Sequence, residues 1–383
     1  MGAMRVERTT SDSFTVRPPT AAWGSFDVQL ALYALALAVL GLLMAYTNSV
    51  GSPLAPGSTF TRGLIWFAVA IVVFVAAASF DYRWLRTLSW LVYLVNIGLL
   101  IVTLAVGSGV GGVSRWVSIF GLQFQFSEVA KVLMIGVLAA FIAARHDSMN
   151  RVSTLIGAGL LMGPPFALVM IQPDLGTSLV FGAVLFGMLF MTGLSLRWLL
   201  LPIAIGLAAL PVLWTILQGY QQRRILSFLN PAADPLGSGF QVIQSQIAVS
   251  SGGMFGRGLN GGGPGTEYLP VQSTDFAGAV LFQELGFIGG LVVFVLFIAL
   301  IWRILIVGWR SDDLFAIAFA AGIASMLLFQ VTVNVGMVLG IMPITGIPLP
   351  FVTHGGASLI SVALGLGLLQ SINMRRAAPD WYR

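Results

Sequence analysis

Asp275 is the residue of this sequence best placed to transfer a proton. It ends a long polar stretch, and an apolar run begins at Phe276. Ser273 or Thr274 could cap the helix that starts there, which would place Asp275 in the first turn, where the helix dipole stabilises a carboxylate. An ionised carboxylate in that position can act as a general base. A first-turn aspartate can equally serve the helix alone, so the local sequence leaves both interpretations open.

Two ionisable residues, Glu128 and Lys131, fall inside an apolar run. Such a side chain at the bilayer centre costs about 2.5–3.5 kcal/mol and needs a partner or a water-filled cavity. The two residues share one face of a helix, for which Ser127 could be the N-cap. We favour an ion pair that aligns the helix bundle. Direct contact with a substrate is the alternative interpretation.

Breaks in the apolar runs mark further polar positions. Residues 172–174 separate two spans almost without a loop, and Asp174 would cap the second span. Residues 342–351 contain three prolines and cannot form a helix. Such backbone is tolerated at membrane depth only where it is buried in protein or lines a cavity. Gln330 and Asn334, at i and i+4, are expected to point into the bundle and to form hydrogen bonds between helices.

The elements that must hold these residues are transmembrane helices. The sequence is 57% hydrophobic and 9% charged, with a mean hydropathy of +0.94. Apolar runs of about 20 residues, the length that crosses a bilayer as a helix, recur along it. We predict an all-α, polytopic integral membrane protein of about ten spans. The predicted spans are 28–47, 62–79, 87–106, 127–144, 153–171, 175–192, 196–217, 276–301, 313–340 and 350–371.

The distribution of arginine predicts the orientation in the membrane. An even number of spans puts both termini on one side, and that side holds 13 arginines against 5 on the other. Because Lys and Arg are retained in cytoplasmic loops, both termini should be cytoplasmic. The net charge of +5 is then explained by topology and anionic lipid, and we do not expect nucleic acid as a partner. The absence of cysteine excludes thiol chemistry.

This topology divides the chain into three regions. Residues 1–27 form a cytoplasmic tail that is expected to be disordered, 28–371 form the ten-helix membrane domain, and 372–383 form a cytoplasmic C-terminal tail. The membrane domain includes a long extracytoplasmic loop, 218–275, between the seventh and eighth spans. A polar insertion of this length between spans usually carries function.

The long loop itself contains two recognisable segments. Phe240, Ile243 and Ile247 recur at helical spacing, which predicts an amphipathic helix on the bilayer surface. Residues 250–265 contain eight glycines and are expected to be flexible enough to close over a ligand. The glycines match neither a Walker loop nor a dinucleotide fingerprint.

Six motifs in a fixed order carry a resemblance to a known family. They are Asn230-Pro231 through Asp234-Pro235, Gly237-x-Gly239-Phe240-Gln241 with Gln244-Ser245, Ser251-Gly252-Gly253 with Gly256-x-Gly258, Thr274-Asp275-Phe276, Glu284-Leu285-Gly286, and the segment from Pro343 to Gly356. In a ten-span frame they resemble the SEDS family, which comprises RodA, FtsW and SpoVE. Asn230 is more similar to the RodA branch, because FtsW-type proteins tend to carry an aspartate there.

The resemblance implies a peptidoglycan glycosyltransferase in the bacterial cytoplasmic membrane. It would polymerise lipid II on the outer face during cell elongation and shape maintenance, beside a class B penicillin-binding protein that crosslinks the strands. The family's catalytic aspartate falls on Asp275, the arginine of its Gly-x-x-Arg-Trp motif on Arg115, and its intramembrane pair on Glu128 and Lys131. Glu284, in the Glu-Leu-Gly motif, joins the predicted substrate-binding residues.

The implied reaction inverts the sugar, because an α-linked polyprenyl pyrophosphate must give a β-1,4 product. Asp275 would remove the proton of the acceptor 4-hydroxyl, a role worth about 10²- to 10⁴-fold in rate. Arg115, Arg223 and Arg224 would neutralise the pyrophosphate, together with a divalent cation, Mg²⁺ or Mn²⁺, if one binds. From the residues alone, Arg115 beside Trp116 also fits a simple interfacial anchor.

Three positions depart from the usual family motifs. Ser273 stands where a histidine usually precedes Thr-Asp-Phe, and Gln283 stands where the first of two glutamates is usual, so a second acidic partner for a metal is missing. Thr353-His354-Gly355-Gly356-Ala357 replaces the usual Ser-Tyr-Gly-Gly-Ser. His354 could compensate as a polar group, although a hydrogen-bonded buried histidine is the simpler interpretation.

Two other functions remain compatible with the sequence. A lipid II flippase or transporter would also need the two helix breaks and the charged pair inside the bilayer. A noncatalytic scaffold would only hold and activate the penicillin-binding partner, and Asp275 would then be dispensable. Polymer synthesis from lipid II by the purified protein, with and without partner, separates all three functions.

Overall fold

The computed structural model describes most of the chain. The described residues are 23–49, 53–55, 57–107, 115–119, 122–146, 151–208, 211, 214–215, 219–231, 238–259, 276–353 and 355–376. Among the predicted functional residues, Asp275 and His354 lie outside these ranges. The flexible loop expected at 250–265 is described only up to residue 259.

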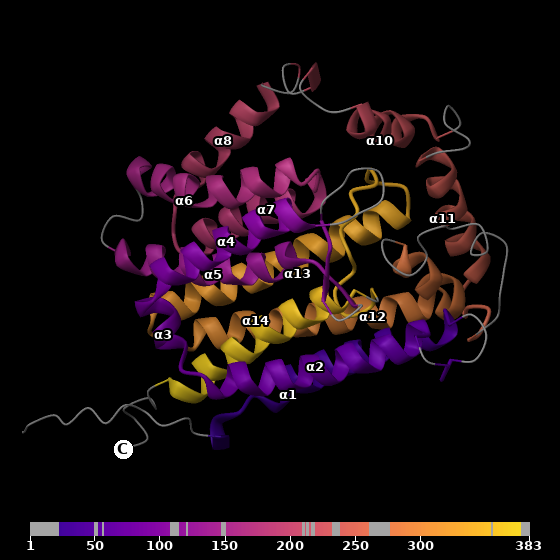
Figure 1. Ribbon diagram of the computed structural model, residues 1–383, viewed down its shortest axis with the longest axis horizontal. Coiled ribbons are helices and arrows are strands. Elements are labelled where there is room, and N and C mark those ends of the chain that lie inside the picture. Colours follow the sequence, from indigo (N-terminus) through magenta and orange to yellow (C-terminus); the bar gives the residue numbers. More distant parts are fainter. Residues whose placement is uncertain are drawn as a thin grey trace, which may run out of the picture.

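The fold consists of helices with one short hairpin. In chain order the elements are η1 (Trp23–Ser25), α1 (Val28–Thr47), α2 (Thr59–Ser79), α3 (Tyr82–Thr87), α4 (Ser89–Val106), β1 (Val117–Ile119), β2 (Leu122–Phe124), α5 (Phe126–Ala144), α6 (Val152–Ile171), α7 (Leu175–Met191), α8 (Leu196–Ala208), α10 (Gly219–Leu229), α11 (Ser238–Gly252), α12 (Ala277–Trp309), α13 (Leu314–Val338) and α14 (Gly356–Arg375). The strands β1 and β2 pair antiparallel, with Val117 opposite Phe124. The long helices run side by side as a bundle (Figure 1).

Eight of the described helices are long and apolar enough to cross a membrane, and α7, with 17 residues, is a shorter apolar helix. The prediction of an all-α, polytopic membrane protein is therefore confirmed, while the count of ten spans stays a prediction. Of the seventh predicted span, 196–217, the structure describes a helix over Leu196–Ala208 and further helical residues at 211, 214 and 215. The tenth begins at Gly356 instead of residue 350, because prolines remove the backbone donors that a helix needs.

The bundle has an inner and an outer set of helices. About three quarters of α5, α13 and α14 is buried (72%, 72% and 78% of their apolar windows), against 11% of α2 and 17% of α4. Apolar side chains on the outer helices thus face lipid, and those on the inner helices face protein. Polar groups on the inner helices are therefore enclosed by protein and must find partners there.

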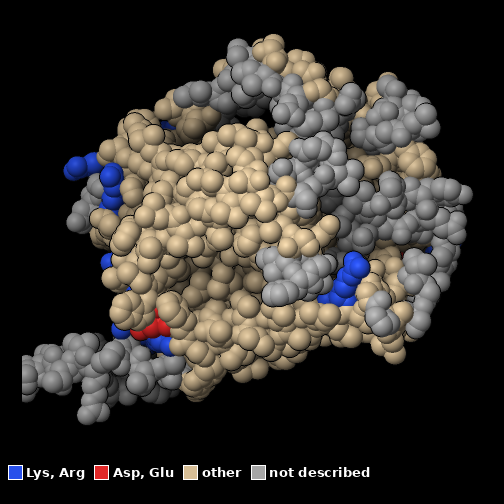
Figure 2. Space-filling view, in the orientation of Figure 1, with Lys and Arg blue, Asp and Glu red and all other residues tan. Residues whose placement is uncertain are grey.

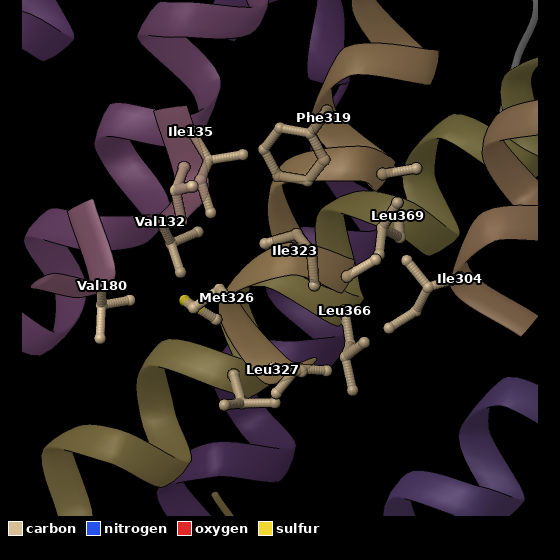
Figure 3. Close-up of a cluster of buried hydrophobic side chains, with 14 of the residues drawn as sticks. Val132, Ile135, Val180, Ile304, Phe319, Ile323, Met326, Leu327, Leu366 and Leu369 are labelled. Carbon is tan, nitrogen blue, oxygen red and sulfur yellow. The ribbon is translucent and has the colours of Figure 1, made fainter. Parts of the chain in front are cut away.

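Close packing of small and branched side chains holds the inner helices together. Gly365 of α14 lets α13 approach, since a methyl group added at Gly365 would lie 2.7 Å from Cδ1 of Ile323. Buried side chains of five helices meet at this level (Figure 3): Val132 and Ile135 of α5, Val180 of α7, Ile304 of α12, Phe319, Ile323, Met326 and Leu327 of α13, and Leu366 and Leu369 of α14.

Two predicted details of the helix ends are wrong, and one is confirmed. Asp174 caps α7, as predicted, by accepting a hydrogen bond from Thr177 N. Ser127 does not cap α5, because the hairpin before it lets the helix begin earlier, with Gln125 as N-cap. Helix α12 has Phe276 as its N-cap, so neither Ser273 nor Thr274 caps it, and Asp275 precedes the helix instead of occupying its first turn.

The loop helix α11, predicted from Phe240, Ile243 and Ile247, packs one face against the bundle. Its buried residues include Val242, Ser245 and Ala248, whereas Ile247 is 37% exposed. Ser245 Oγ donates to the carbonyl of Val338 over 2.9 Å, which docks α11 on the end of α13. The helix also packs along α12. The predicted helix is therefore present, with one face covered by protein, and its place on the bilayer surface stays a prediction.

Candidate active site

A hydrogen-bonded cluster surrounds the break between α6 and α7. Arg115 Nε donates to the carbonyl of Gln172 over 3.1 Å, and Gln172 Nε2 donates to the carbonyl of Leu100 over 2.9 Å. Gln125 Nε2, at the start of α5, donates to Oδ2 of Asp174 over 2.8 Å. Arg115 is thus held against the break by the same group of residues that ties α4, α5 and α7 together.

Both carboxylate oxygens of Asp174 accept hydrogen bonds within this cluster. Its Oδ1 accepts from Thr177 N over 3.1 Å, and its Oδ2 accepts from Thr177 Oγ1 over 2.9 Å as well as from Gln125. The residue is 3% exposed. Its role is therefore to start α7 and to fix α5 beside it.

The proline-rich break at 343–350 docks onto the first break. Gly176, in the first turn of α7, is necessary there, since a methyl group would lie 2.5 Å from the carbonyl oxygen of Thr345. Asn334 Nδ2 donates to the carbonyl of Ile347 over 2.7 Å. Asn334 and Gln330 are buried (0% and 1% exposed), which confirms their predicted direction into the bundle.

The start of α12 lies beside the second break. A methyl group added at Gly278 would lie 3.1 Å from Oδ1 of Asn334 and 3.8 Å from Leu349. Gly278 is the second residue of α12, whose N-cap is Phe276. The start of α12 therefore lies next to the docked breaks and, through them, on the same side of the fold as the Arg115 cluster.

Helix α12 is interrupted soon after its start, at Gly286, where φ is +67° and ψ is −169°. The backbone groups released by the interruption bond to residues 252–258, which we name the glycine clamp. Four main-chain hydrogen bonds join the two: Arg257 N to Gln283 O at 3.0 Å, Gly258 N to Glu284 O at 3.1 Å, Phe287 N to Gly253 O at 2.9 Å, and Ile288 N to Met254 O at 3.1 Å. The glycine clamp is thereby joined to α12 through main-chain atoms.

Glu284 lies within this set of bonds between the glycine clamp and α12, which we name the joint. Its side chain is largely enclosed, with the residue 9% exposed, and its carbonyl accepts from the glycine clamp. The neighbouring Gln283 is 3% exposed. The structure thus places Glu284 near the start of α12, in the same helical segment that follows Asp275, and its predicted substrate-binding role stays a prediction.

Glu128 and Lys131 form the ion pair that their spacing predicts. Lys131 Nζ lies 2.6 Å from Glu128 Oε1, with side-chain exposures of 1% and 3%. Ser361 Oγ of α14 donates to the carbonyl of Glu128 over 2.7 Å, so the pair lies at the contact between α5 and α14. The ion pair begins three residues after Gln125, the N-cap of α5. Gln125 belongs to the hydrogen-bonded cluster around Arg115, so the pair and the cluster lie near the same end of α5.

The remaining predicted site residues lie farther along the loop. Arg223 and Arg224 belong to α10, which contacts α11. Helices α10 and α11 lie along the upper right of the molecule, above and beside the start of α12 (Figure 1). Within the described ranges no group of three His, Asp or Glu side chains gathers, and a divalent cation at the pyrophosphate stays a prediction.

An apolar cavity of about 380 Å³ adjoins the start of α12. It is lined by α11, α12 and α13, with Gly278 at one place and the exposed side chains of Phe287 and Leu291 at another. It therefore extends from the surroundings of α12's first turns toward the lipid-facing surface. An isoprenoid chain has the chemistry that such a lining accepts.

Sequence reasoning did not predict several residues of this site. Gln125 and Gln172 bridge the helices, and Gly278 permits the close approach at the start of α12. A glutamine directly before the Pro-Asp break was a usable signal for Gln172, since a buried amide at membrane depth needs partners. Nothing local marks Gln125, because its partner is 49 residues away.

These observations define a multi-pass helical membrane protein whose polar interior gathers around two docked helix breaks. Comparison with known sequences then identifies its family. The profile of the Cell cycle protein family FtsW/RodA/SpoVE matches residues 28–378, so the chain belongs to that family, as its motifs predicted.

The similar proteins include curated relatives and solved structures. The chain is 35% identical over 355 residues to Stage V sporulation protein E of Bacillus subtilis, covering 91% of this chain and 96% of the relative. It is 37% identical over 354 residues to peptidoglycan glycosyltransferase MrdB of Escherichia coli, covering 91% and 94%. Rod shape determining protein RodA of Thermus thermophilus aligns with a TM-score of 0.69 and 28% identity, over 93% of this chain and 99% of that structure.

A further solved structure concerns an assembly. One chain of a peptidoglycan synthase complex, described as coordinating polymerization and crosslinking, aligns with a TM-score of 0.79 and 30% identity, over 92% of this chain and 99% of that chain. The multi-pass membrane character of the protein is thus supported by both its own helices and its relatives.

Proposed function

We propose that the protein is a peptidoglycan glycosyltransferase that polymerises lipid II, with Asp275 as the general base. Family membership and the named activity of the relatives support the reaction class. The observation that carries the residue assignment is the position of Gly278 against Asn334 and Leu349. It supports the assignment because the start of α12, which directly follows Asp275 in the sequence, lies beside the polar interior formed by the two breaks.

The proposed step is a single displacement at the anomeric carbon of the donor sugar. The 4-hydroxyl oxygen of the acceptor attacks C1 from the face opposite the pyrophosphate, and the new O–C1 bond forms as the bond from C1 to the phosphate oxygen breaks. The electron pair leaves with the pyrophosphate, and the hydroxyl proton passes to the carboxylate of Asp275. The configuration at C1 is inverted, which gives the β-linked product.

Arg115 is suited to stabilise the leaving pyrophosphate. Its Nε donates to Gln172, which fixes the plane of the guanidinium group. Among the described residues, neither Nη atom of Arg115 has a hydrogen-bond partner. The two Nη groups can therefore bind phosphate oxygens in the paired geometry that arginine favours. Arg223 and Arg224, on the helix above, would add charge neutralisation.

The apolar cavity beside Gly278 supports a lipid-linked substrate. Its lining matches a polyprenyl chain, and its position would keep the attached pyrophosphate near the start of α12. With the predicted orientation, this start faces the extracytoplasmic side. A class B penicillin-binding protein is the proposed membrane partner, supported by the similarity to a chain of a peptidoglycan synthase complex.

A lipid II flippase is the second candidate function. The observation that favours it is the pair of docked breaks with the buried Glu128–Lys131 ion pair, because discontinuous helices and intramembrane charges are common along transport paths. Purified protein in vesicles would then move labelled lipid II across the bilayer without forming polymer.

The decisive experiment incubates purified full-length protein with labelled lipid II, alone and with its partner. We expect Asp275→Asn to fold, to bind lipid II and to lose polymerisation by about 10²-fold or more. Glu267→Gln, which neutralises another carboxylate of the same loop, should polymerise at the wild-type rate. Wild-type activity of Asp275→Asn would refute the assignment, and transbilayer movement without polymer would support the flippase instead.

A further inference from the structure

One corner of the bundle brings together the ends of three helices. The chain before α1 joins the end of α14 through reciprocal bonds: Asp27 N donates to Gln370 Oε1 over 2.9 Å, and Gln370 Nε2 donates to the carbonyl of Asp27 over 2.7 Å. Arg303, near the end of α12, donates from Nε to both carboxylate oxygens of Asp27, over 2.7 and 3.0 Å. Figure 1 shows the beginning of α1 and the end of α14 close together at the lower left.

Arginines at this end of the bundle differ in their partners. Arg86 pairs with Asp313 over 3.3 Å, and Arg375 approaches Asp81 over 3.9 Å while donating to backbone carbonyls. On the visible face the acidic and several basic side chains lie toward this left end, another basic group lies to the right, and a broad uncharged surface separates them (Figure 2). Arg310 and Arg376 form no ion pair with any described carboxylate, including the exposed Asp312 nearby.

Two of these arginines, Arg303 and Arg310, lie close enough to Arg376 for their charges to act on it. Burial lowers the pKa of Arg376 most, the positive charges of Arg310 and Arg303 lower it further, and Asp27 raises it in part. Asp27, the carboxylate that acts on Arg376, already forms an ion pair with Arg303. We name Arg303, Arg310 and Arg376 the arginine corner. Its excess positive charge would be relieved by a bound anion.

The side chains around the arginine corner indicate the level in the bilayer at which such an anion would bind. Trp309, directly before Arg310, is 88% exposed, and Trp302, directly before Arg303, is 66% exposed. Exposed tryptophans at the ends of membrane helices favour the headgroup region of the bilayer. Basic pockets between helix ends at that depth suit lipid phosphates.

We propose that the arginine corner binds the phosphate of an anionic phospholipid headgroup, with the acyl chains lying along the lipid-facing surface of α12. Arg310 and Arg376 supply the two guanidinium groups that are not engaged by protein carboxylates. Arg303, fixed by Asp27, adds a third positive charge from a rigid position. This site is at the opposite end of α12 from Asp275 and does not depend on the proposed reaction.

The test compares lipids on the purified full-length protein in detergent micelles. Binding of phosphatidylglycerol and of phosphatidylcholine is measured by native mass spectrometry, and the unfolding temperature is followed with each lipid. We expect phosphatidylglycerol to bind about tenfold more tightly, a difference of about 1.4 kcal/mol. Arg310→Gln/Arg376→Gln should remove this preference, whereas Arg151→Gln/Arg197→Gln, which removes two exposed arginines elsewhere, should retain it.

Inorganic phosphate, at the same concentrations and at matched ionic strength, should not raise the unfolding temperature. Equal stabilisation by phosphate would mean a site for free anions and would overturn the lipid assignment. The proposal also fails if both double variants lose the preference equally, or if the wild type has none. In phosphatidylcholine, Arg310→Gln/Arg376→Gln should unfold at no lower temperature than the wild type, because it removes repulsion; a lower temperature would contradict the proposal.

Discussion

Gly256 of the glycine clamp lies directly against Gly286 of α12. A methyl group added at Gly256 would lie 2.7 Å from Gly286 N, and one added at Gly286 would overlap Gly256 N. Both residues have positive φ, +80° and +67°. Each glycine therefore makes room for the other's backbone, and the four hydrogen bonds of the joint depend on both.

Replacing Gly286 should weaken the whole joint. Gly286→Ala places a side chain in a backbone region that is essentially restricted to glycine, which costs about 1–3 kcal/mol before the overlap with Gly256 is counted. We expect a lower unfolding temperature and slower polymerisation. Gly159→Ala, in α6 with open space around it, should not lower the unfolding temperature, since alanine favours a helix by about 0.5–1 kcal/mol. Equal unfolding temperatures for the two variants would contradict the role of the joint.

Glu128 and Lys131 should stabilise the fold only when both are present. Glu128→Gln leaves a buried ammonium group without its carboxylate, and such losses typically cost about 3–5 kcal/mol. The double variant Glu128→Gln/Lys131→Met removes the stranded charge and should recover most of the unfolding temperature. If the pair only aligns α5 and α14, the double variant also keeps polymerisation within about tenfold of wild type, a change of about 1.4 kcal/mol in the barrier. A stable but inactive double variant would instead indicate substrate contact.

Asn334 should anchor the proline-rich break. Asn334→Asp keeps the shape of the side chain but removes the donor to the Ile347 carbonyl, so a buried acceptor loses its partner at a cost of about 1–3 kcal/mol. Thermal unfolding measures the loss. Asn230→Asp makes the same chemical change at an exposed position and should alter stability by no more than about 0.5 kcal/mol. A similar shift in both variants would show that the anchor contributes nothing.

Arg115 should act on the reaction more than on stability. Arg115→Gln removes the guanidinium donors proposed for the pyrophosphate and should slow polymerisation by about 10²–10³-fold. Arg115→Lys retains the charge but not the planar fork and should be intermediate. The exposed Arg62→Gln serves as the control and should stay active. Full activity of Arg115→Gln would reduce Arg115 to an interfacial anchor.

Much of the fold followed from local sequence. Runs of apolar residues predicted the helices, and the i, i+3 spacing predicted the ion pair, because both depend on residues that are neighbours along the chain. Asp174 was predicted as a cap for the same reason. The start of α5 was not, since the hairpin before Ser127 moved the cap to Gln125.

The features that the local sequence did not predict depend on contacts between distant segments. The covered face of α11 is chosen by the ends of α12 and α13, and the interruption at Gly286 is matched by main-chain atoms of the glycine clamp. Hydrogen bonds between main-chain atoms do not depend on residue type, so a sequence marks them only through the glycines that allow the close approach. Asp275 lies outside the described residues, so its catalytic role continues to depend on its motif and on the placement of α12.

The glycine clamp has a mechanical consequence. Because main-chain hydrogen bonds couple it to α12 on both sides of Gly286, a force applied to the extramembrane loop is delivered to the first turns of α12 while the long remainder stays packed in the bundle. A protein that binds this loop would thereby change the rate of the proposed polymerisation through α12, without contacting either reactant.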